Sequence, residues 1–372
     1  MNQTPTPKMK LSILEGVGLY NGESAEQALR HATEAAQQAD ELGFTRLWFT
    51  EHHSSKHQMS TSPDLLIAHA AALTKNIRVG SGGVMLPNHS PLRVVENFSI
   101  LEALHPGRID LGMGRASGTS AMTNAALRNS QEPLTGQGLM NLLLEVLAFF
   151  DRDFPDDHPY QDITPSPATS LRPDLYMLGS SDGGMRIASQ LGMGFAFAGQ
   201  INPEMAIPVL RAYREAFQPS KYLAQPYSIL STIVVCAETD EEAQYLAGPA
   251  ELQWARWGTG QIHHAPPTLE EAATHRYTAA EEQARAGSEG RFIVGSPQRV
   301  KDRLMQLAEA GQVDELMAMN MMTDRQAQMT SHALLAEAFE RGELTAEHVR
   351  VIQSVLASIP PHLDSHRPAL EA

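Results

Sequence analysis

Residues 77–119 contain two short apolar strand patterns, each ending in glycines, with one amphipathic helix pattern between them. The first pattern runs into Gly82 and Gly83, and the second runs into Gly114 and Arg115. Glycine at the carboxyl end of a parallel strand lets a ligand approach the backbone closely. An arginine directly after such a strand is suited to holding phosphate. The two strand ends together predict a barrel mouth that binds a flat, phosphorylated cofactor.

Short strand patterns alternate with longer helical patterns along the chain. Helical periodicity is clear from Ser24 to Leu42, where Gly43 supplies the stop. Strand–helix alternation with short connections favours a parallel sheet, and eight strands favour its closure into an α/β fold of the (β/α)8 TIM-barrel type. The segments predicted as strands are Lys10–Leu14, Arg46–Thr50, Arg78–Ser81, Ile109–Gly112, Leu175–Leu178, Phe195–Ala198, Ile229–Val235 and Glu315–Met319. Further helices are predicted at Leu92–Leu104, Gly184–Leu191, Glu204–Phe217 and Pro297–Ala310.

One domain spanning residues 1–372 is expected, because α/β barrels of this length often form a single unit. Two segments interrupt the alternation and are predicted to be insertions after strands four and seven, at residues 119–170 and 251–291. The second contains two tryptophans and follows a strand at the catalytic face, which is typical of a lid. The tail, residues 362–372, is predicted to be frayed.

Charge and cysteine content exclude several classes of protein. The net charge of −15 argues against a nucleic-acid or anionic-membrane surface, because both need clustered Lys and Arg. Cys236 is the only cysteine, so an intrachain disulfide and a cysteine-based metal site are excluded, which fits a reducing compartment. No secretory-signal core and no apolar run near the roughly 20 residues of a membrane span are present. We therefore expect a soluble, cytoplasmic protein without nucleic-acid or membrane partners.

The segment Trp48–His53 places polar residues at the end of the second predicted strand. Alternation along a strand predicts that Glu51 and His53 face one side and His52 the other. Polar residues at this end of a barrel strand are typical of active sites, where a neutral histidine acts as a general base or a hydrogen-bond donor. In the alternative interpretation, one histidine only anchors the loop. A metal bound by Glu51, His52, His53 and His57 is a further alternative, but adjacent histidines diverge on a strand, so no metal site is predicted.

Two glycine-containing strand ends flank the helix predicted at Leu92–Leu104. Gly82 and Gly83 permit unusual peptide geometry, and Met85 offers a soft apolar bed for an aromatic ring system; a β-bulge is the alternative. Arg115 can clamp a phosphate together with nearby backbone N–H groups, or it can be a surface arginine in a flexible loop. The Gly-x-Gly before it lacks the rest of a dinucleotide fingerprint, so a Rossmann site is not predicted.

A third candidate site, Gly179, Ser180 and Ser181, lies between the fifth predicted strand and its helix. Small residues with free N–H groups at a helix N-terminus form an anion site, and the hydroxyls add donors. Helix capping by Ser181 or Asp182 is the alternative, and it is compatible with phosphate binding. The methionines near the C-terminus are predicted to fill the barrel rather than bind a ligand: Met317, Met319, Met321 and Met322.

Taken together, these residues resemble the bacterial luciferase-like flavin monooxygenase family, and most strongly its uncharacterised single-subunit members. The resemblance covers about residues 10–325, and its runs EHH, VMLPNHSP and PGRIDLGxGR are specific as a set. The segments that carry it, in the family's order, are Trp48–His53, Val79–Pro91, Pro106–Arg115, Leu178–Ser181 and Ile293–Lys301.

The resemblance implies a barrel that binds FMN, or in one branch a deazaflavin coenzyme, at its mouth, and a homodimer. By position, His52 matches a histidine that assists the chemistry, Gly82–Gly83 matches a frequent non-prolyl cis peptide beside the flavin ring, and Arg115 and Ser180 match phosphate contacts. Luciferase subunits carry a reactive cysteine where this chain has Gly114, so light emission is not implied.

The activity implied is that of a two-component monooxygenase. Reduced FMN from a separate flavin reductase reacts with O₂ to give a C4a-peroxyflavin, a dry pocket shields it, and His52 steers proton transfer while a small organic substrate is oxygenated. A deazaflavin-dependent hydride transferase is the first alternative, although its polyanionic coenzyme calls for extra Lys or Arg at the mouth. A non-catalytic flavin-binding protein is the second, and the presence of His52 argues against it. The substrate's identity is not predicted.

Overall fold

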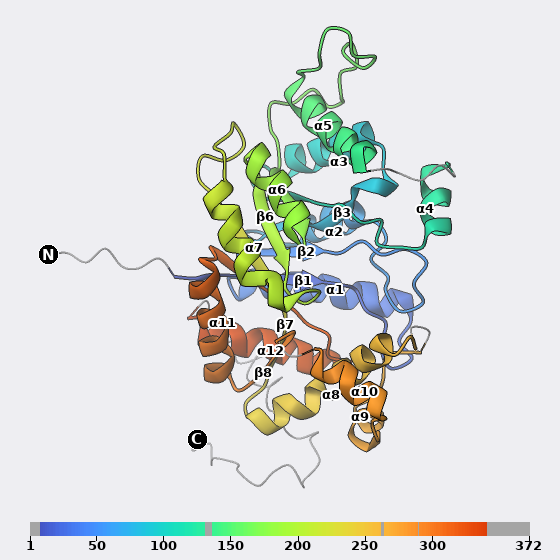
Figure 1. Cartoon of the computed structure of the whole chain (residues 1–372), viewed down its shortest axis with the longest axis vertical. Helices are drawn as coiled ribbons and strands as arrows, with labels where there is room; N and C mark the ends of the chain where they lie inside the picture. Colours follow the sequence, from blue (N-terminus) through green and yellow to red (C-terminus); the bar gives the residue numbers. More distant parts are fainter. Residues whose placement is uncertain (1–7, 131–135, 262–263, 289, 341–372) are drawn as a thin grey trace, which may run out of the picture.

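Eight parallel strands close into a barrel in the computed structural model, which describes residues 8–130, 136–261, 264–288 and 290–340 (Figure 1). Around the barrel, β1 to β7 and β9 follow one another in sequence order, and the pairing of β6 with β7 closes the circuit. The predicted TIM barrel is therefore confirmed. The strands are β1 (Lys10–Glu15), β2 (Arg46–Phe49), β3 (Arg78–Met85), β4 (Ile109–Gly114), β5 (Asp174–Gly179), β6 (Gly194–Ala198), β7 (Ser228–Cys236), β8 (Phe292–Gly295) and β9 (Glu315–Met319).

Helices cover the outside of the barrel. Ser24 begins the first of them through a capping box with Gln27, and Gly43, at φ +72°, follows its end as predicted. The helices are α1 (Ala25–Glu41), α2 (Pro63–Leu73), α3 (Pro91–Leu104), α4 (Ala121–Arg128), α5 (Gly136–Asp151), α6 (Asp182–Leu191), α7 (Pro203–Ala216), α8 (Asp240–Gly258), α9 (Leu269–Thr274), α10 (Ala279–Ala286), α11 (Pro297–Gly311) and α12 (Arg325–Ala338), with a 3₁₀ turn at Leu86–Asn88. None of those described combines the length and apolar character needed to cross a membrane.

One strand was missed by the sequence analysis. The eight predicted strands correspond to β1–β7 and β9, whereas β8 lies outside the barrel circuit and pairs with the end of β7, Ile233 to Cys236. β8 forms because β7 extends beyond its partners in the barrel, and the sequence gives no local sign of that extension. Helix α6 also begins at Asp182, two residues before the predicted start at Gly184.

Two long connections extend from the barrel at opposite ends of the molecule. The connection between β4 and β5 contains α4 and α5, and the one after β7 contains α8, α9 and α10 (Figure 1). The proposed insertion boundary at residue 251 falls inside α8. The predicted frayed tail, residues 362–372, lies outside the described residues.

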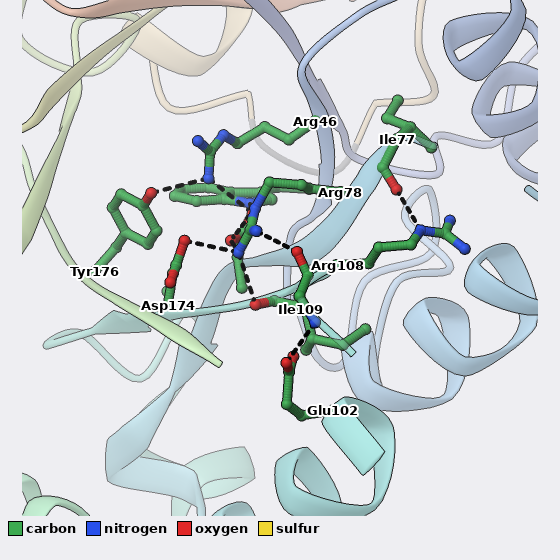
Figure 2. A network of polar contacts seen from close by, with 12 residues as sticks. Arg46, Ile77, Arg78, Glu102, Arg108, Ile109, Asp174 and Tyr176 are labelled. Carbon is green, nitrogen blue, oxygen red and sulfur yellow. Dashed lines mark hydrogen bonds and ion pairs between the residues drawn. The ribbon is translucent and has the colours of Figure 1, made fainter. Parts of the chain in front are cut away.

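A buried layer of charge crosses the barrel interior at the amino ends of the strands. Arg46 on β2 donates to Asp110 at 2.8 Å and to the two carboxylate oxygens of Glu315 at 2.7 and 3.0 Å, and all three side chains are almost fully buried. Arg78 pairs with Asp110 and extends the network to Asp174. Figure 2 shows Arg78 beside Asp174. We call Arg46, Asp110 and Glu315 the charged layer.

An apolar layer lies above the charged layer, toward the carboxyl ends of the strands. It comprises Leu14, Trp48, Tyr176, Ala196, Ile229 and Met317, one residue from each of six strands. The Trp48 indole N–H donates to Asp110 at 2.9 Å, and the Tyr176 hydroxyl accepts from Arg46 at 2.9 Å. These bonds join the two layers, so the barrel is packed rather than hollow below its mouth.

The charged layer generates a stability prediction. Arg46→Met should lower the free energy of unfolding by about 3–5 kcal/mol, because it leaves Glu315 buried without a cation and Asp110 with Arg78 alone. Urea unfolding at neutral pH, followed by tryptophan fluorescence, measures the change. The control is Arg186→Met, which removes an exposed ion pair with Asp182 and should change stability by less than about 1 kcal/mol. Equal losses in the two variants would contradict the role given to Arg46.

Candidate active site

A cavity of about 540 Å³ opens at the carboxyl ends of the barrel strands. Leu14, Trp48 and Met317 of the apolar layer form part of its wall, and most of the remaining wall is apolar. Its size falls within the roughly 300–1,000 Å³ typical of small-molecule sites, and the carboxyl-terminal face is where TIM-barrel enzymes carry their active sites. We call it the main cavity.

The structure brings the predicted site residues together at the main cavity, with one exception. The residues in its wall are His52, Gly82, Met85, Arg115, Gly179, Ser180 and Ser181. Gly83 packs against β4 instead, where an added Cβ would lie 2.6 Å from the carbonyl oxygen of Gly112. The cis peptide that the resemblance implied is present at Gly82–Gly83, and the register of β3 with β4 shifts between Gly82 and Val84.

One end of the main cavity is built to receive an anion. Arg115 lies against the first turn of α6, where a Cβ added to Gly183 would be 1.8 Å from the guanidinium Nη1. Arg115 has no hydrogen bond or ion pair with any described residue. Ser181 is the N-cap of α6, but its side chain makes no capping bond, and Asp182 is paired with Arg186 at 3.0 Å. Unpaired guanidinium, hydroxyl and backbone N–H groups therefore converge at a helix N-terminus.

The wall also contains polar atoms that have no partner in the chain. Thr50 Oγ1, Gln200 Oε1 and Ser231 Oγ are buried, line the main cavity and lack a hydrogen-bond partner among the described residues. Buried polar groups in proteins are nearly always hydrogen-bonded. These atoms are therefore suited to the polar edge of a bound ring system, and the residues present fit a flavin phosphate cofactor.

His52 reaches the main cavity from the loop after β2. Its Nδ1 lies 3.4 Å from the carbonyl oxygen of Gly118. Since a carbonyl only accepts, this contact places the proton on Nδ1 and leaves Nε2 as an acceptor. Burial lowers the pKa of His52 below its ordinary value, so the imidazole is neutral at neutral pH. A neutral imidazole at the wall of an apolar cavity can accept and return one proton.

Glu51 and His53 do not line the cavity, so His52 lies apart from them as expected. Because β2 ends at Phe49, this arrangement belongs to the loop and not to a continued strand. Fully buried Glu51 accepts hydrogen bonds from His53 (2.8 Å), His89 (2.8 Å), the Asn88 amide (3.0 Å) and the backbone N–H of Met85 (2.9 Å). Burial opposes the ionisation of Glu51, but these donors outweigh it and lower its pKa below the ordinary value. Glu51 thereby ties the end of β2, and with it His52, to the segment after β3.

Glu51, His53 and His89 form the only group of at least three potential metal ligands among the described residues. The ligand atoms of Glu51, His53 and His89 lie within 4.8 Å of one another. His52 and His57, which the metal alternative had included, are not part of this group. Because the Glu51 oxygens already accept from a backbone N–H and an amide, the group fits an anchor for the loop.

Sequence reasoning missed several residues of the wall. Trp254 and Trp257 on α8 contribute two rings with centroids 5.3 Å apart, and Gln58 and Ser231 add polar groups. Arg291 lies 4.4 Å from the Trp254 ring and donates to the carbonyl of Ile201 at 2.8 Å. The i, i+3 spacing of the tryptophans places both rings on one helix face and was the available signal.

The sulfur-containing residues divide between core and cavity. Met317 and Met322 are buried, and Met317, Met319 and Met321 line the main cavity. Cys236 is buried at the end of β7, and burial raises the pKa of its thiol to about 12. A buried thiol of such high pKa is chemically inert in the folded protein.

Known proteins share this sequence and fold. The model of the luciferase-like monooxygenase family matches residues 9–314. The uncharacterized protein YceB of Bacillus subtilis is 40% identical over 330 residues, which cover 88% of this chain and 99% of YceB. The N-acetyl-S-alkylcysteine monooxygenase of B. subtilis is 38% identical over 240 residues, which cover 63% of this chain and 70% of that protein. The crystal structure of apo-MsnO8 is 37% identical, with a TM-score of 0.82 over 90% of this chain and 100% of that one.

More distant structures share the barrel fold alone. One is the FMN complex of the oxygenating constituent of 3,6-diketocamphane monooxygenase from Pseudomonas putida, at 22% identity and a TM-score of 0.66 over 91% of this chain and 99% of that one. Another is an F420-dependent secondary alcohol dehydrogenase, at 14% identity and a TM-score of 0.64 over 91% of this chain and 100% of that one. The family match and the relatives above 30% identity cover most of the barrel. The chain therefore belongs to the luciferase-like monooxygenase family.

Proposed function

We propose that this protein is a two-component monooxygenase that uses reduced FMN and O₂ to oxygenate a small organic substrate. The observation that carries the proposal is the unpaired Arg115, which follows β4 and lies against the first turn of α6, at one end of an apolar cavity with neutral His52 in its wall. Reduced FMN supplies the activation of O₂ when it is bound. The chain supplies the binding, the orientation, a dry cavity and a proton acceptor.

The cofactor's two parts match two regions of the main cavity. Arg115, Ser180 and Ser181 would hold the phosphate at the N-terminus of α6. Gly82 and Met85 would lie against the ring system. Gly82 has no side chain to obstruct the ring, and the polarizable sulfur of Met85 packs well against an aromatic surface. Trp254 and the other apolar side chains would exclude water from the reacting atoms.

The alternative functions differ in the charged side chains that their cofactor sites need. Arg115 is the one Lys or Arg in the described wall of the main cavity, whereas the polyanionic tail of a deazaflavin coenzyme needs several cations. A non-catalytic flavin-binding protein would need the phosphate site but not a neutral histidine beside the ring. The chain carries no evident NAD(P)H fingerprint, so a separate flavin reductase is proposed as the source of reduced FMN.

The proposed phosphate site can be tested by removing its cation. Arg115→Ala should weaken FMN binding by about 1.5–3 kcal/mol, roughly 10- to 150-fold in Kd, which is typical of a lost hydrogen bond to a charged group. Flavin fluorescence titration measures the affinity. Arg93→Ala, on the exposed face of α3, is the matched control and should bind FMN like the wild type. Unchanged affinity in Arg115→Ala would remove Arg115 from the site.

A further prediction concerns His52. Reduced FMN bound to the wild-type protein should be re-oxidised by air more slowly than free reduced FMN, and His52→Ala should abolish the difference, because the acceptor Nε2 is lost. Stopped-flow absorbance measures both rates, with the exposed His69→Ala as the control. The wild-type delay should persist through the pH range in which an ordinary histidine becomes protonated and should shorten only at lower pH, because burial lowers the pKa of His52. Identical rates for free and wild-type-bound flavin would refute the monooxygenase proposal.

A homodimer is proposed from exposed leucine and isoleucine side chains on two adjacent helices, α2 and α3. Their exposed fractions are 69% for Leu65, 46% for Leu73, 45% for Ile100 and 66% for Leu104. Sedimentation velocity should give twice the chain mass for the wild type and one chain mass for the double variant Leu65→Arg, Leu104→Arg. Met122→Arg on α4, 81% exposed, is the control and should stay dimeric. A monomeric wild type would exclude this interface.

A further inference from the structure

A second, smaller cavity of about 120 Å³ adjoins the main cavity, beside α8 and the ends of β1 and β9. Four residues line both cavities: Gln58, Trp257, Met319 and Met321. We call the smaller cavity the side chamber. The two cavities are therefore direct neighbours that share part of their walls.

Polar atoms in the side chamber lack partners. Gln253 Oε1, Asn320 Nδ2 and Thr323 Oγ1 are buried and have no hydrogen-bond partner among the described residues. Gln253 and Thr323 are only 5% and 3% exposed. Leaving a buried polar group unsatisfied costs about 1–3 kcal/mol, so a ligand that supplies both a donor and an acceptor would recover this energy.

The acidic group in the described wall of the side chamber is Glu15. Burial raises the pKa of Glu15 above its ordinary value, so its carboxyl ionises at a higher pH than that of an exposed glutamate. Glu15, at the end of β1, lines it and accepts a hydrogen bond from the backbone N–H of Val17 at 2.6 Å. The cation that acts on Glu15 is Arg325, but Arg325 is ion-paired with Glu23 at 2.8 Å and is absent from the chamber wall. No Lys or Arg lines the described part of the chamber.

The remaining titratable groups do not reverse this balance. Burial, followed by the nearby Lys56, lowers the pKa of His57, so this side chain is neutral at neutral pH. Burial raises the pKa of Tyr20 to about 12, so its phenol keeps its proton. His264 lies at the exposed rim. A carboxylate or phosphate ligand would therefore meet Glu15 without a compensating cation.

We propose that the side chamber binds the polar end of the substrate and selects an uncharged group with N–H or O–H donors, such as a primary amide, over a carboxylate. An amide donates to Glu15 and Gln253 while its carbonyl oxygen accepts from Asn320. The substrate class is then a neutral organic molecule with an apolar body and an amide or hydroxyl end. That the bound molecule is a substrate rests on the proposed monooxygenase function.

Matched probes test the selectivity directly. Hexanamide and hexanoate share an apolar body and differ only at the end group. Titrated into the full chain in mildly alkaline buffer, with tryptophan fluorescence and calorimetry as readouts, hexanamide should bind at least tenfold more tightly. Glu15→Gln should lower the amide-to-carboxylate preference at least tenfold by removing the negative charge. Glu34→Gln, on the exposed face of α1, is the control and should keep the preference.

A second variant guards against misfolding of the first. Gln253→Leu removes an unpartnered acceptor and should weaken hexanamide several-fold with hexanoate unchanged. Equal affinity for the two probes in the wild type, no measurable binding of either, or an unaltered preference in Glu15→Gln would overturn the proposal. Each titration is repeated with oxidised FMN present. If FMN fails to bind but the amide preference remains, the monooxygenase function fails and the side chamber stands.

Discussion

The buried ion pairs of Arg46 with Asp110 and Glu315 are the constraint on which the rest of the barrel depends. They join β2, β4 and β9, so the strands between them close around these three side chains. Because the side chains are almost fully buried, solvent cannot replace a lost ion-pair partner. Trp48 bonds to Asp110 and is also part of the cavity wall. The charged layer thus lies beneath the main cavity, at the amino ends of the strands, and Trp48 connects the two.

The carboxyl ends of the strands carry both polar groups that are fully hydrogen-bonded and polar groups that have no partner in the described chain. The Glu51 carboxylate accepts four hydrogen bonds from surrounding donors, and these bonds hold the loop that carries His52. In the wall of the main cavity, the side chains of Arg115 and Ser181 have no hydrogen-bond partner in the described chain. A satisfied network positions catalytic groups, whereas unsatisfied groups are left for a ligand. The division between the two kinds of polar residue supports the proposed cofactor site without reference to any relative.

The barrel was predictable because period-two and period-3.6 patterns alternate along the chain. Most of the proposed site residues could be placed at one cavity because they follow strand ends within short motifs. The side chamber was not. Glu15 looks like an ordinary polar residue at the end of a strand. On α8 the spacing of the two tryptophans was a signal, but nothing in the sequence around Gln253 indicates that its side chain faces a cavity. Strand β8 was missed for a related reason: its partner is an extension of β7, and pairing of this kind exists only in three dimensions.

The distribution of sulfur has a consequence for the lifetime of the protein. The single thiol, Cys236, is buried and carries its proton, while Met319 and Met321 stand in the wall where reduced flavin and O₂ would meet under the proposed function. Hydrogen peroxide that escapes coupling would encounter thioether before thiol, and methionine sulfoxide would turn an apolar wall polar. Oxidative damage to these methionines would then increase with the number of turnovers rather than with time, and a methionine sulfoxide reductase could reverse it.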